Sequence, residues 1–456
     1  MDRSMSKRLG ASLAVVALLV LACGGTTATP TPAPSAGPTT APTMAPSAAP
    51  TSCQSDATKT PVEVQGWWTT GGEANGFNKI IADFNAANPT LCVYNAAIAG
   101  GAGSVAQGRI KAAVLAGLPP DTFQVHMGHE LLDTYVNLPG GSVMSPLGTD
   151  IIDPAQFPAG VVKIISGSDG KIYSVPLNIH RANELWYNKA IFTANNLTAP
   201  TTWAEFETDA TALKAAGITP LAIGDSGIWA NGMVFETVLI GTLGADGFLG
   251  LWTGATKWSD PKVTDALNEY KKILDPANGW VNTDHSSLSW DQAADKLIDG
   301  SAAMTIMGDW ANGEFTAKNF TGYGWAPAPG NATIYQALSD SFGLPVKAPH
   351  QDGAKAFLAY LAMATTQAIF NPYKGSIAAN VTSGDPPAGE LQYSDYQKSA
   401  QADWKTNTIV PSMEHGAAAN PAWSSAINDV LTSFVTDLDV SAAQAALVTA
   451  AAGFTQ

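Results

Sequence analysis

The chain has 456 residues, of which 46% are hydrophobic and 13% are charged, so it can bury at least one large core. Wholesale disorder is therefore excluded. The formal net charge of −15 repels phosphate backbones and anionic lipid headgroups, so we expect no nucleic-acid partner.

By its sequence pattern, the first apolar run, Leu9–Ala22, is the only stretch long, apolar and uncharged enough to enter a bilayer, and it spans 14 residues. It is too short for an ordinary spanning helix. It follows a basic head at residues 3–8, which is typical of a secretory signal peptide over residues 1–22. The sequence around Cys23 resembles the bacterial lipobox, so we expect Cys23 to carry lipid and to anchor an extracytoplasmic protein to the cell membrane. The alternative is ordinary signal cleavage nearby, with Cys23 lost.

A low-complexity segment follows, in which Thr26–Pro50 contains seven threonines, seven prolines and seven alanines but no charged or aromatic residue. Such a composition cannot form a core, and its prolines favour extended polyproline II. We therefore expect residues 23–60 to combine the lipidated cysteine with a semi-rigid tether.

Two further cysteines, Cys53 and Cys92, lie in an oxidising compartment after export, which favours a disulfide between them. The alternative is a buried Cys92 and a free Cys53 thiol.

From residue 60 onward, short apolar strands alternate with amphipathic helices. This β-α-β-α-β order predicts a largely parallel sheet, whose strand ends are the usual place for a ligand. The folded part has roughly 400 residues, too many for one ordinary core, so we expect two lobes. The first predicted elements are a strand at Val62–Val64, a helix containing Ile80, Ile81 and Phe84, a strand at 91–98, a helix at 104–117 and a strand at Thr122–His126. Further helix starts are predicted at the capping box Thr202–Glu205 and at Asp260 before Pro261.

Thirteen tryptophans are many for this length, and several lie beside glycine or polar residues, where a buried aromatic ring is unusual. A pyranose has a face of C–H groups that stacks on an aromatic ring and a belt of hydroxyls that needs charged or amide partners. Each candidate also has a structural alternative, since tryptophans fill cores, Glu73 could stabilise a helix N-terminus and Asp340 could form a turn. The candidates are Trp67, Trp68, Trp290 and Trp310 among the aromatic residues, and Glu73, Gln124, His126 and Asp340 at likely strand ends.

Two motifs that suggest other chemistry fail on their spacing. His126, His129 and Glu130 do not follow the His-Glu-x-x-His order that places two imidazoles on one helix face, so we expect no metal and no other cofactor. The glycine-rich segment at residues 100–103 lacks the Lys-Ser/Thr of a P-loop and the spacing of a dinucleotide loop. We expect a tight strand-to-helix turn there.

A further set of segments agrees in order with one known family. The segments are Glu63–Trp68, Pro119–His126, Ser174–Arg181, Met307–Trp310, Leu338–Pro345, Asn371–Ala378 and His415–Gly416. In these segments the chain resembles the extracellular sugar-binding proteins of bacterial ABC importers, and within them the glucose/galactose-binding branch. The resemblance covers essentially all of residues 60–456.

The resemblance implies an α/β fold of two lobes, the type II-like periplasmic-binding-protein fold, with a multi-strand hinge and a central ligand cleft. The chain is expected to cross between the lobes near residues 176–180, 328–336 and 374–378. Lobe 1 then comprises residues 61–176 and 337–374, and lobe 2 comprises residues 177–336 and 375–456.

In that family one monosaccharide is held by side chains that match nine positions here. The nine are Trp67, Glu73, Gln124, His126, Trp290, Trp310, Asp340, Lys374 and His415. Trp290 and Trp310 offer stacking surface, Glu73 and Asp340 accept hydroxyl protons, Lys374 donates them, and Gln124, His126 and His415 orient the ring. The match at Glu73 is looser, because the preceding loop varies in length among relatives. His180 and Arg181 either lie near the cleft or brace the hinge as a structural pair.

The expected function is that of a non-enzymatic monomer that captures glucose, or galactose, and delivers it to the membrane subunits of an ABC permease. A surface sensor or lectin-like protein without a permease is one alternative, which gene neighbourhood would separate. An extracellular glycoside hydrolase is a remote alternative, because it needs two carboxylates facing one bond. Glu73 and Asp340 could pair in this way, but a site for a free monosaccharide has no bond to cleave.

Overall fold

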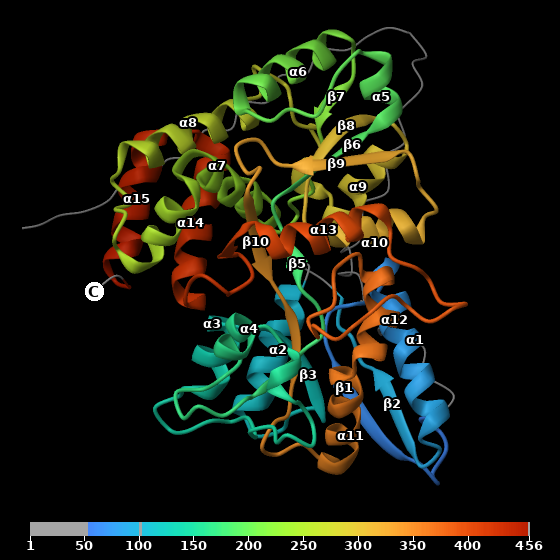
Figure 1. Ribbon diagram of the computed structural model, residues 1–456. Helices are drawn as coiled ribbons and strands as arrows, with labels where there is room; N and C mark the ends of the chain where they lie inside the picture. The colour runs from blue at the N-terminus through green and yellow to red at the C-terminus, as the bar shows by residue number, and fades with distance from the viewer. Residues whose placement is uncertain (1–52, 100–102, 455–456) are drawn as a thin grey trace, which may run out of the picture. The chain divides into compact units, whose positions relative to one another are not determined.

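The computed structural model describes residues 53–99 and 103–454. The predicted signal peptide, the lipidation site at Cys23 and most of the tether lie outside the described residues. Within the described part, helices and strands alternate along the chain and the strands form three sheets (Figure 1).

The first sheet contains, in spatial order, β2 (Leu91–Asn95), β1 (Thr60–Gln65), β3 (Thr122–His126), β11 (Asp340–Gly343) and β4 (Ser174–Pro176). The predicted β-α-β-α-β unit is confirmed, since β1 pairs in parallel with both β2 and β3. Strand β11 is antiparallel to β3 and to β4, so only one side of this sheet is parallel. Strand β2 ends at Asn95, earlier than predicted, although the Ile98 amide still donates to the Gly66 carbonyl.

Four main helices accompany this sheet, together with several short turns of helix. They are α1 (Gly71–Ala87), α2 (Ser104–Leu115), α11 (Gln351–Ala362) and α12 (Ala364–Lys374); the short turns are α3 (His129–Leu131), a π-helical turn at Leu132–Val136, a 3₁₀ turn at Pro154–Gln156 and α4 (Ala159–Ile164). Helix α1 buries its predicted apolar face and lies beside α12 (Figure 1). A Cβ on Gly72 would overlap the carbonyl oxygens of Tyr373 and Gly313, so only glycine lets the start of α1 come this close to the end of α12.

The second sheet has the order β7 (Thr219–Leu221), β8 (Ala302–Ile306), β6 (Glu184–Asn188) and β9 (Tyr323–Pro327). The remaining helices of the described residues are α5 (Lys189–Ala194), α6 (Trp203–Ala215), α7 (Trp229–Thr253), α8 (Pro261–Leu274), α9 (Trp290–Ile298), α10 (Trp310–Ala317), α13 (Asp395–Thr406), α14 (Pro421–Asp437) and α15 (Val440–Ala452), with a 3₁₀ turn at His285–Ser287. Both predicted helix starts are confirmed: Thr202 and Glu205 form the capping box of α6, and Asp260 caps α8 with Pro261 in its first turn.

The third sheet is small and consists of β12 (Thr408–Pro411), β10 (Ile334–Leu338) and β5 (His180–Arg181). The chain passes from β4 to β5 over residues 176–180, and Ile179 forms a bridge with Ile377. From β10 the chain enters the first sheet after Ser339, at β11. The crossings between lobes near residues 176–180, 328–336 and 374–378 stay a prediction.

Helix α7 corrects one expectation about membranes. By length and composition it could also span a bilayer, so Leu9–Ala22 is not the only stretch of that kind. However, 61% of its most apolar 18-residue stretch is buried inside the protein, and Gly244 interrupts the helix with a φ of 71°. Most of its buried apolar side chains belong to the apolar core that surrounds the second sheet, and Ala230 and Met233 belong to the other core. Packing inside the protein therefore accounts for its apolar character.

Cys53 and Cys92 form the predicted disulfide, with Cα atoms 5.6 Å apart. Cys92 lies at the start of β2, and Trp67 follows the end of the adjacent strand β1. Because these two strands are parallel, the disulfide lies at the opposite end of the sheet from the predicted sugar-binding residues.

Candidate functional site

Eight of the nine predicted ligand-binding residues line one cavity of about 260 Å³. They come from segments that are far apart in the sequence but end at the same place. The eight are Trp67 after β1, Glu73 in α1, His126 at the end of β3, Trp290 and Trp310 at the starts of α9 and α10, Asp340 at the start of β11, Lys374 at the end of α12 and His415 after β12. The structure therefore brings these side chains together around a single space.

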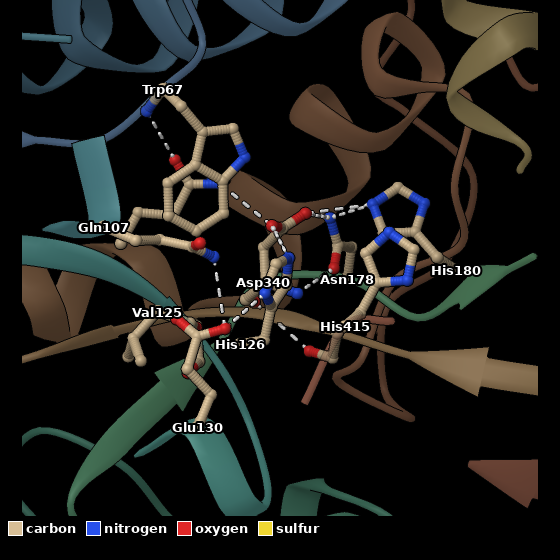
Figure 2. A network of polar contacts seen from close by, with 12 residues as sticks. Trp67, Gln107, Val125, His126, Glu130, Asn178, His180, Asp340 and His415 are labelled. Carbon is tan, nitrogen blue, oxygen red and sulfur yellow. Dashed lines mark hydrogen bonds and ion pairs between the residues drawn. The ribbon is translucent and has the colours of Figure 1, made fainter. Parts of the chain in front are cut away.

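Asp340 is the centre of the polar network at this cavity (Figure 2). Its Oδ1 accepts a hydrogen bond of 2.8 Å from Nε2 of Gln124, and its Oδ2 accepts one of 2.9 Å from Nδ2 of Asn178. Nε2 of His180 lies 3.0 Å from the same Oδ2, and Nζ of Lys374 lies 3.9 Å from it. The carboxylate is thus held in one orientation by partners on both oxygens.

The charged groups beside Asp340 keep it ionised. Burial alone would raise the pKa of its carboxyl, but the Lys374 ammonium and the hydrogen-bonded His180 hold that pKa well below its usual range. Lys374 also forms an ion pair with Glu73, which the close approach at Gly72 brings within reach. The site therefore offers a sugar two carboxylates and one ammonium.

Gln124 is the one predicted residue that does not line the cavity. Its amide oxygen accepts a hydrogen bond of 3.1 Å from the backbone N–H of Trp67, and its amide nitrogen donates to Asp340. Both ends of its side chain are therefore bonded to the protein. Gln124 fixes two cavity residues from behind rather than facing the cavity itself.

His180 and Arg181 have different surroundings although they are adjacent. His180 lines the cavity and lies between two carboxylates, with Nδ1 hydrogen-bonded to Asp309 and Nε2 facing Asp340. Burial lowers the pKa of its imidazole, but Asp309 outweighs burial and the net shift is upward. Arg181 is buried away from the cavity against Glu184 and Asp403, as a structural residue.

The pKa values of the other two histidines of the site shift in opposite directions. Nδ1 of His126 lies 2.7 Å from Oε2 of Glu130, and this carboxylate raises the His126 pKa although burial opposes it. His415 has no such partner, and burial together with the positive fields of His126 and His180 lowers its pKa well below the usual range. His415 is therefore neutral near pH 7.

The tryptophan pair after β1 divides between the cavity and the core. Trp67 lines the cavity with its ring centroid 5.0 Å from that of His126, whereas Trp68 is buried among phenylalanines of the first sheet. Gly103, with a φ of 109°, lies directly against the Trp67 ring. Across the cavity the rings of Trp290 and Trp310 meet nearly edge to face, 6.5 Å apart.

Sequence reasoning missed several cavity residues. Trp229, at the start of α7, has its ring 6.3 Å from Trp310 and 6.1 Å from His415. Its flanking residues, Ile228 and Ala230, are apolar, so the signal that singled out the other tryptophans is absent here. Gln107 and Glu414 also line the cavity, and nothing in their local sequence marks them.

This arrangement suits reversible binding of a neutral polyol. The carboxylate pair that the sequence suggested for glycoside hydrolysis, Glu73 and Asp340, does not have the required form: the pKa of Asp340 is lowered and Glu73 is paired with Lys374. Within residues 53–99 and 103–454, no group of three or more His, Cys, Asp or Glu side chains is arranged to hold a metal ion.

Comparison with known proteins places the chain in a family. The profile of the bacterial extracellular solute-binding proteins matches residues 68–368. An uncharacterized ABC transporter extracellular-binding protein of Pyrococcus horikoshii is 31% identical, with 98% of this chain and 96% of that protein aligned. A probable sugar-binding periplasmic protein of Mesorhizobium japonicum is also 31% identical, over 82% of this chain and 88% of that protein.

Among solved structures, the bacterial solute receptor AcbH, described as having an exclusive preference for β-D-galactopyranose, superimposes with a TM-score of 0.75. The alignment covers 87% of this chain and 99% of that one, at 20% identity, and so supports the fold. The two-lobed α/β fold of periplasmic binding proteins is thereby confirmed.

The chain belongs to the bacterial extracellular solute-binding protein family. It is the extracytoplasmic, sugar-binding component of an ABC importer, and a binding protein rather than an enzyme.

Proposed function

We propose that the cavity captures a single hexose, D-glucose first and D-galactose next, for delivery to the ABC permease. The observation that carries this proposal is the number of directed polar groups around a small volume. Asp340, Lys374, Glu73 and three histidines converge on about 260 Å³, which is less than the volume of a typical pocket for a drug-sized ligand. So many oriented donors and acceptors suit the hydroxyls of one ring. A long glycan favours an open groove lined mainly by aromatic rings.

The tryptophans complete the fit to a pyranose. Trp290 and Trp310 present two ring surfaces at nearly right angles, so one can stack on the C–H face of a sugar while the other packs against its edge. Charged groups make strong hydrogen bonds to neutral hydroxyls in a site from which water is excluded, so a few suffice.

Calorimetry across a panel of sugars tests this proposal. The panel contains glucose, galactose, xylose, arabinose and a set of disaccharides, titrated into the same protein preparation. We expect the tightest binding from glucose, followed by galactose. Tight binding of a disaccharide or a pentose without detectable hexose binding would refute the hexose assignment and leave the importer role intact.

We also propose that acylation of Cys23 holds the protein at the cell membrane and that the segment up to residue 60 is its tether. The basic head, the short apolar run and the Ala22–Cys23 junction support this proposal. Mass spectrometry of membrane-fraction protein from wild type and from Cys23→Ala should show an acylated N-terminal cysteine only in the wild type. An unmodified wild-type N-terminus contradicts it.

A further inference from the structure

A buried carboxylate lies behind His415 and reaches it through one hydroxyl. Glu236, on α7, is fully buried, and its Oε2 lies 3.1 Å from Oγ of Ser412. The same Oγ lies 3.0 Å from Nδ1 of His415. The other oxygen of Glu236 accepts the backbone N–H of Met413. Glu236, Ser412 and His415 therefore form a hydrogen-bonded relay that ends at the cavity.

The direction of the hydrogen bonds along this relay follows from the available protons. A hydroxyl has one proton to donate, and an ionised carboxylate can only accept. When Glu236 is ionised, Ser412 therefore donates to Glu236. The contact between Ser412 and His415 is then a hydrogen bond only if Nδ1 carries a proton and donates it. Since a neutral imidazole has a single N–H, Nε2 becomes an acceptor.

Nε2 of His415 is available to a ligand. Among the described residues it has no hydrogen-bond partner, and the ring lines the cavity. The rings of Trp310 and His126 each contact this imidazole, with their centroids 5.3 Å from that of His415. These neighbours hold the ring in place but leave its outer nitrogen unbonded.

We propose that Glu236 and Ser412 are positioning residues that keep the proton of His415 on Nδ1 and so present Nε2 to the ligand as a hydrogen-bond acceptor. The proposal rests on the proposed binding of a sugar in this cavity. It specifies that the His415 side of the site accepts a hydrogen bond from the ligand. The ligand group that meets His415 must be a donor, such as a hydroxyl. A sugar with fluorine or a methoxy group at that position cannot satisfy Nε2.

The protonation of Glu236 determines how the tautomer of His415 changes with pH. Burial raises the pKa of Glu236 to about 7, although the hydrogen bonds from Met413 and Ser412 lower it. Protonated Glu236 donates to Ser412, Ser412 donates to Nδ1, and the imidazole proton moves to Nε2. Glu414 is the titratable group that faces Glu236. The titratable groups that face His415 are His126, His180, Asp340 and Lys374.

Nuclear magnetic resonance of the sugar-free protein with isotope-labelled histidine tests the proposal directly, because ring-nitrogen shifts report which nitrogen carries the proton. The six histidines are few enough to assign, with His415→Asn identifying the signals of His415. At about pH 8.5 we expect the proton on Nδ1 in the wild type. In Ser412→Ala we expect it to move to Nε2, the form favoured in water.

The matched control is Ser424→Ala, which removes a hydroxyl bonded to the Met413 carbonyl in the same loop without touching His415. It should leave the wild-type tautomer unchanged. On acidification to about pH 6 the wild-type proton should shift toward Nε2, and Glu236→Gln should abolish that pH dependence. A wild-type proton on Nε2 at about pH 8.5, or an unchanged tautomer in Ser412→Ala, overturns the proposal.

Sugar affinity provides the second readout. Ser412→Ala should weaken binding about threefold to tenfold at a temperature where the variant is fully folded, whereas Ser424→Ala should bind as the wild type does. Equal affinities for wild type and Ser412→Ala would contradict the positioning role. If the hexose assignment itself is wrong, no hexose binds the wild type, and the tautomer measurement still decides the present proposal.

Discussion

Nε2 of His180 lies 3.0 Å from Oδ2 of Asp340, a contact that joins the third sheet to the first at the cavity. His180 is in β5 and Asp340 begins β11, directly after the chain leaves β10. The residue at the centre of the polar network is therefore bonded to the strand that follows the first sheet's β4 along the chain.

Asp340→Asn should weaken sugar binding by at least about 2 kcal/mol, or roughly thirtyfold. The change keeps the size of the side chain but removes the charge that Lys374 and His180 surround, and it leaves one sugar hydroxyl without its acceptor. Calorimetry with glucose measures the effect. Asp121→Asn is the control, because Asp121 is equally buried near the same sheet but bonds to Glu63 and His350, outside the cavity. Equal losses in both variants would indicate a general structural effect.

Trp290→Ala should cost about 2 kcal/mol of binding free energy, again roughly thirtyfold, if its ring stacks on the sugar. The protein should remain folded, because Trp290 is only partly buried. Trp325→Ala provides the comparison, since Trp325 is also partly buried but packs on Tyr396 outside the cavity. Unchanged affinity in Trp290→Ala would remove this tryptophan from the site.

The unfolding free energy should depend on pH through Glu236. Burial raises its pKa to about 7 in the folded protein, whereas the ordinary value is 4.5. Its contribution is fully present below the ordinary pKa and is lost as the pH rises through about 7, because the buried carboxyl must then ionise. Glu236→Gln does not titrate, so its stability relative to wild type should rise by at most about 3 kcal/mol across this interval.

Denaturant unfolding of both proteins at several pH values measures this difference. A constant difference between wild type and Glu236→Gln from acid to neutral pH would show that Glu236 keeps an ordinary pKa.

Loss of the disulfide should destabilise the protein without changing its sugar affinity. The bond closes a loop of 39 residues, for which chain entropy gives about 2–4 kcal/mol. It lies at the opposite end of the first sheet from the cavity, so Cys53→Ala with Cys92→Ala should bind glucose as the wild type does. Thermal unfolding and calorimetry on the same samples separate the two effects. A large loss of affinity in the folded double variant would contradict this separation.

Sugar should bring the two lobes closer together by hinge bending, since the cavity receives residues from both sheets. Small-angle scattering should show a smaller radius of gyration at saturating glucose than without it. Asp340→Asn at the same sugar concentration should show less compaction. Identical wild-type profiles with and without saturating sugar would count against closure.

Local patterns predicted the early part of the fold well. Alternation of apolar residues in β1 and β3 and the helical spacing of Ile80, Ile81 and Phe84 depend on neighbours a few positions away. The antiparallel insertion of β11 could not be predicted from such patterns, because Phe342 pairs with Gln124, more than two hundred residues earlier. The sequence order of the first three strands therefore suggested a more parallel sheet than the structure has.

The candidate site was likewise predicted only in part. Seven of the nine positions were singled out by residue type and local context, and Lys374 and His415 only by the family resemblance; eight of the nine meet at one cavity. Trp229 was missed because it begins a long apolar helix, where a tryptophan is usually part of the core. Glu236 and Ser412 were missed because their importance depends on a contact between α7 and the loop after β12, which no local spacing reveals.

The disulfide at the start of the described chain also determines where mechanical force enters the protein. Any pull that arrives through residues before Cys53 reaches a covalent bond to Cys92 before it reaches Thr60, the first residue of β1. The load is therefore transferred to the edge strand β2, and the covalent path of the force bypasses the chain between Cys53 and Cys92, which includes β1. Strand β1 leads directly to Trp67, so this path also avoids the segment that carries a cavity residue.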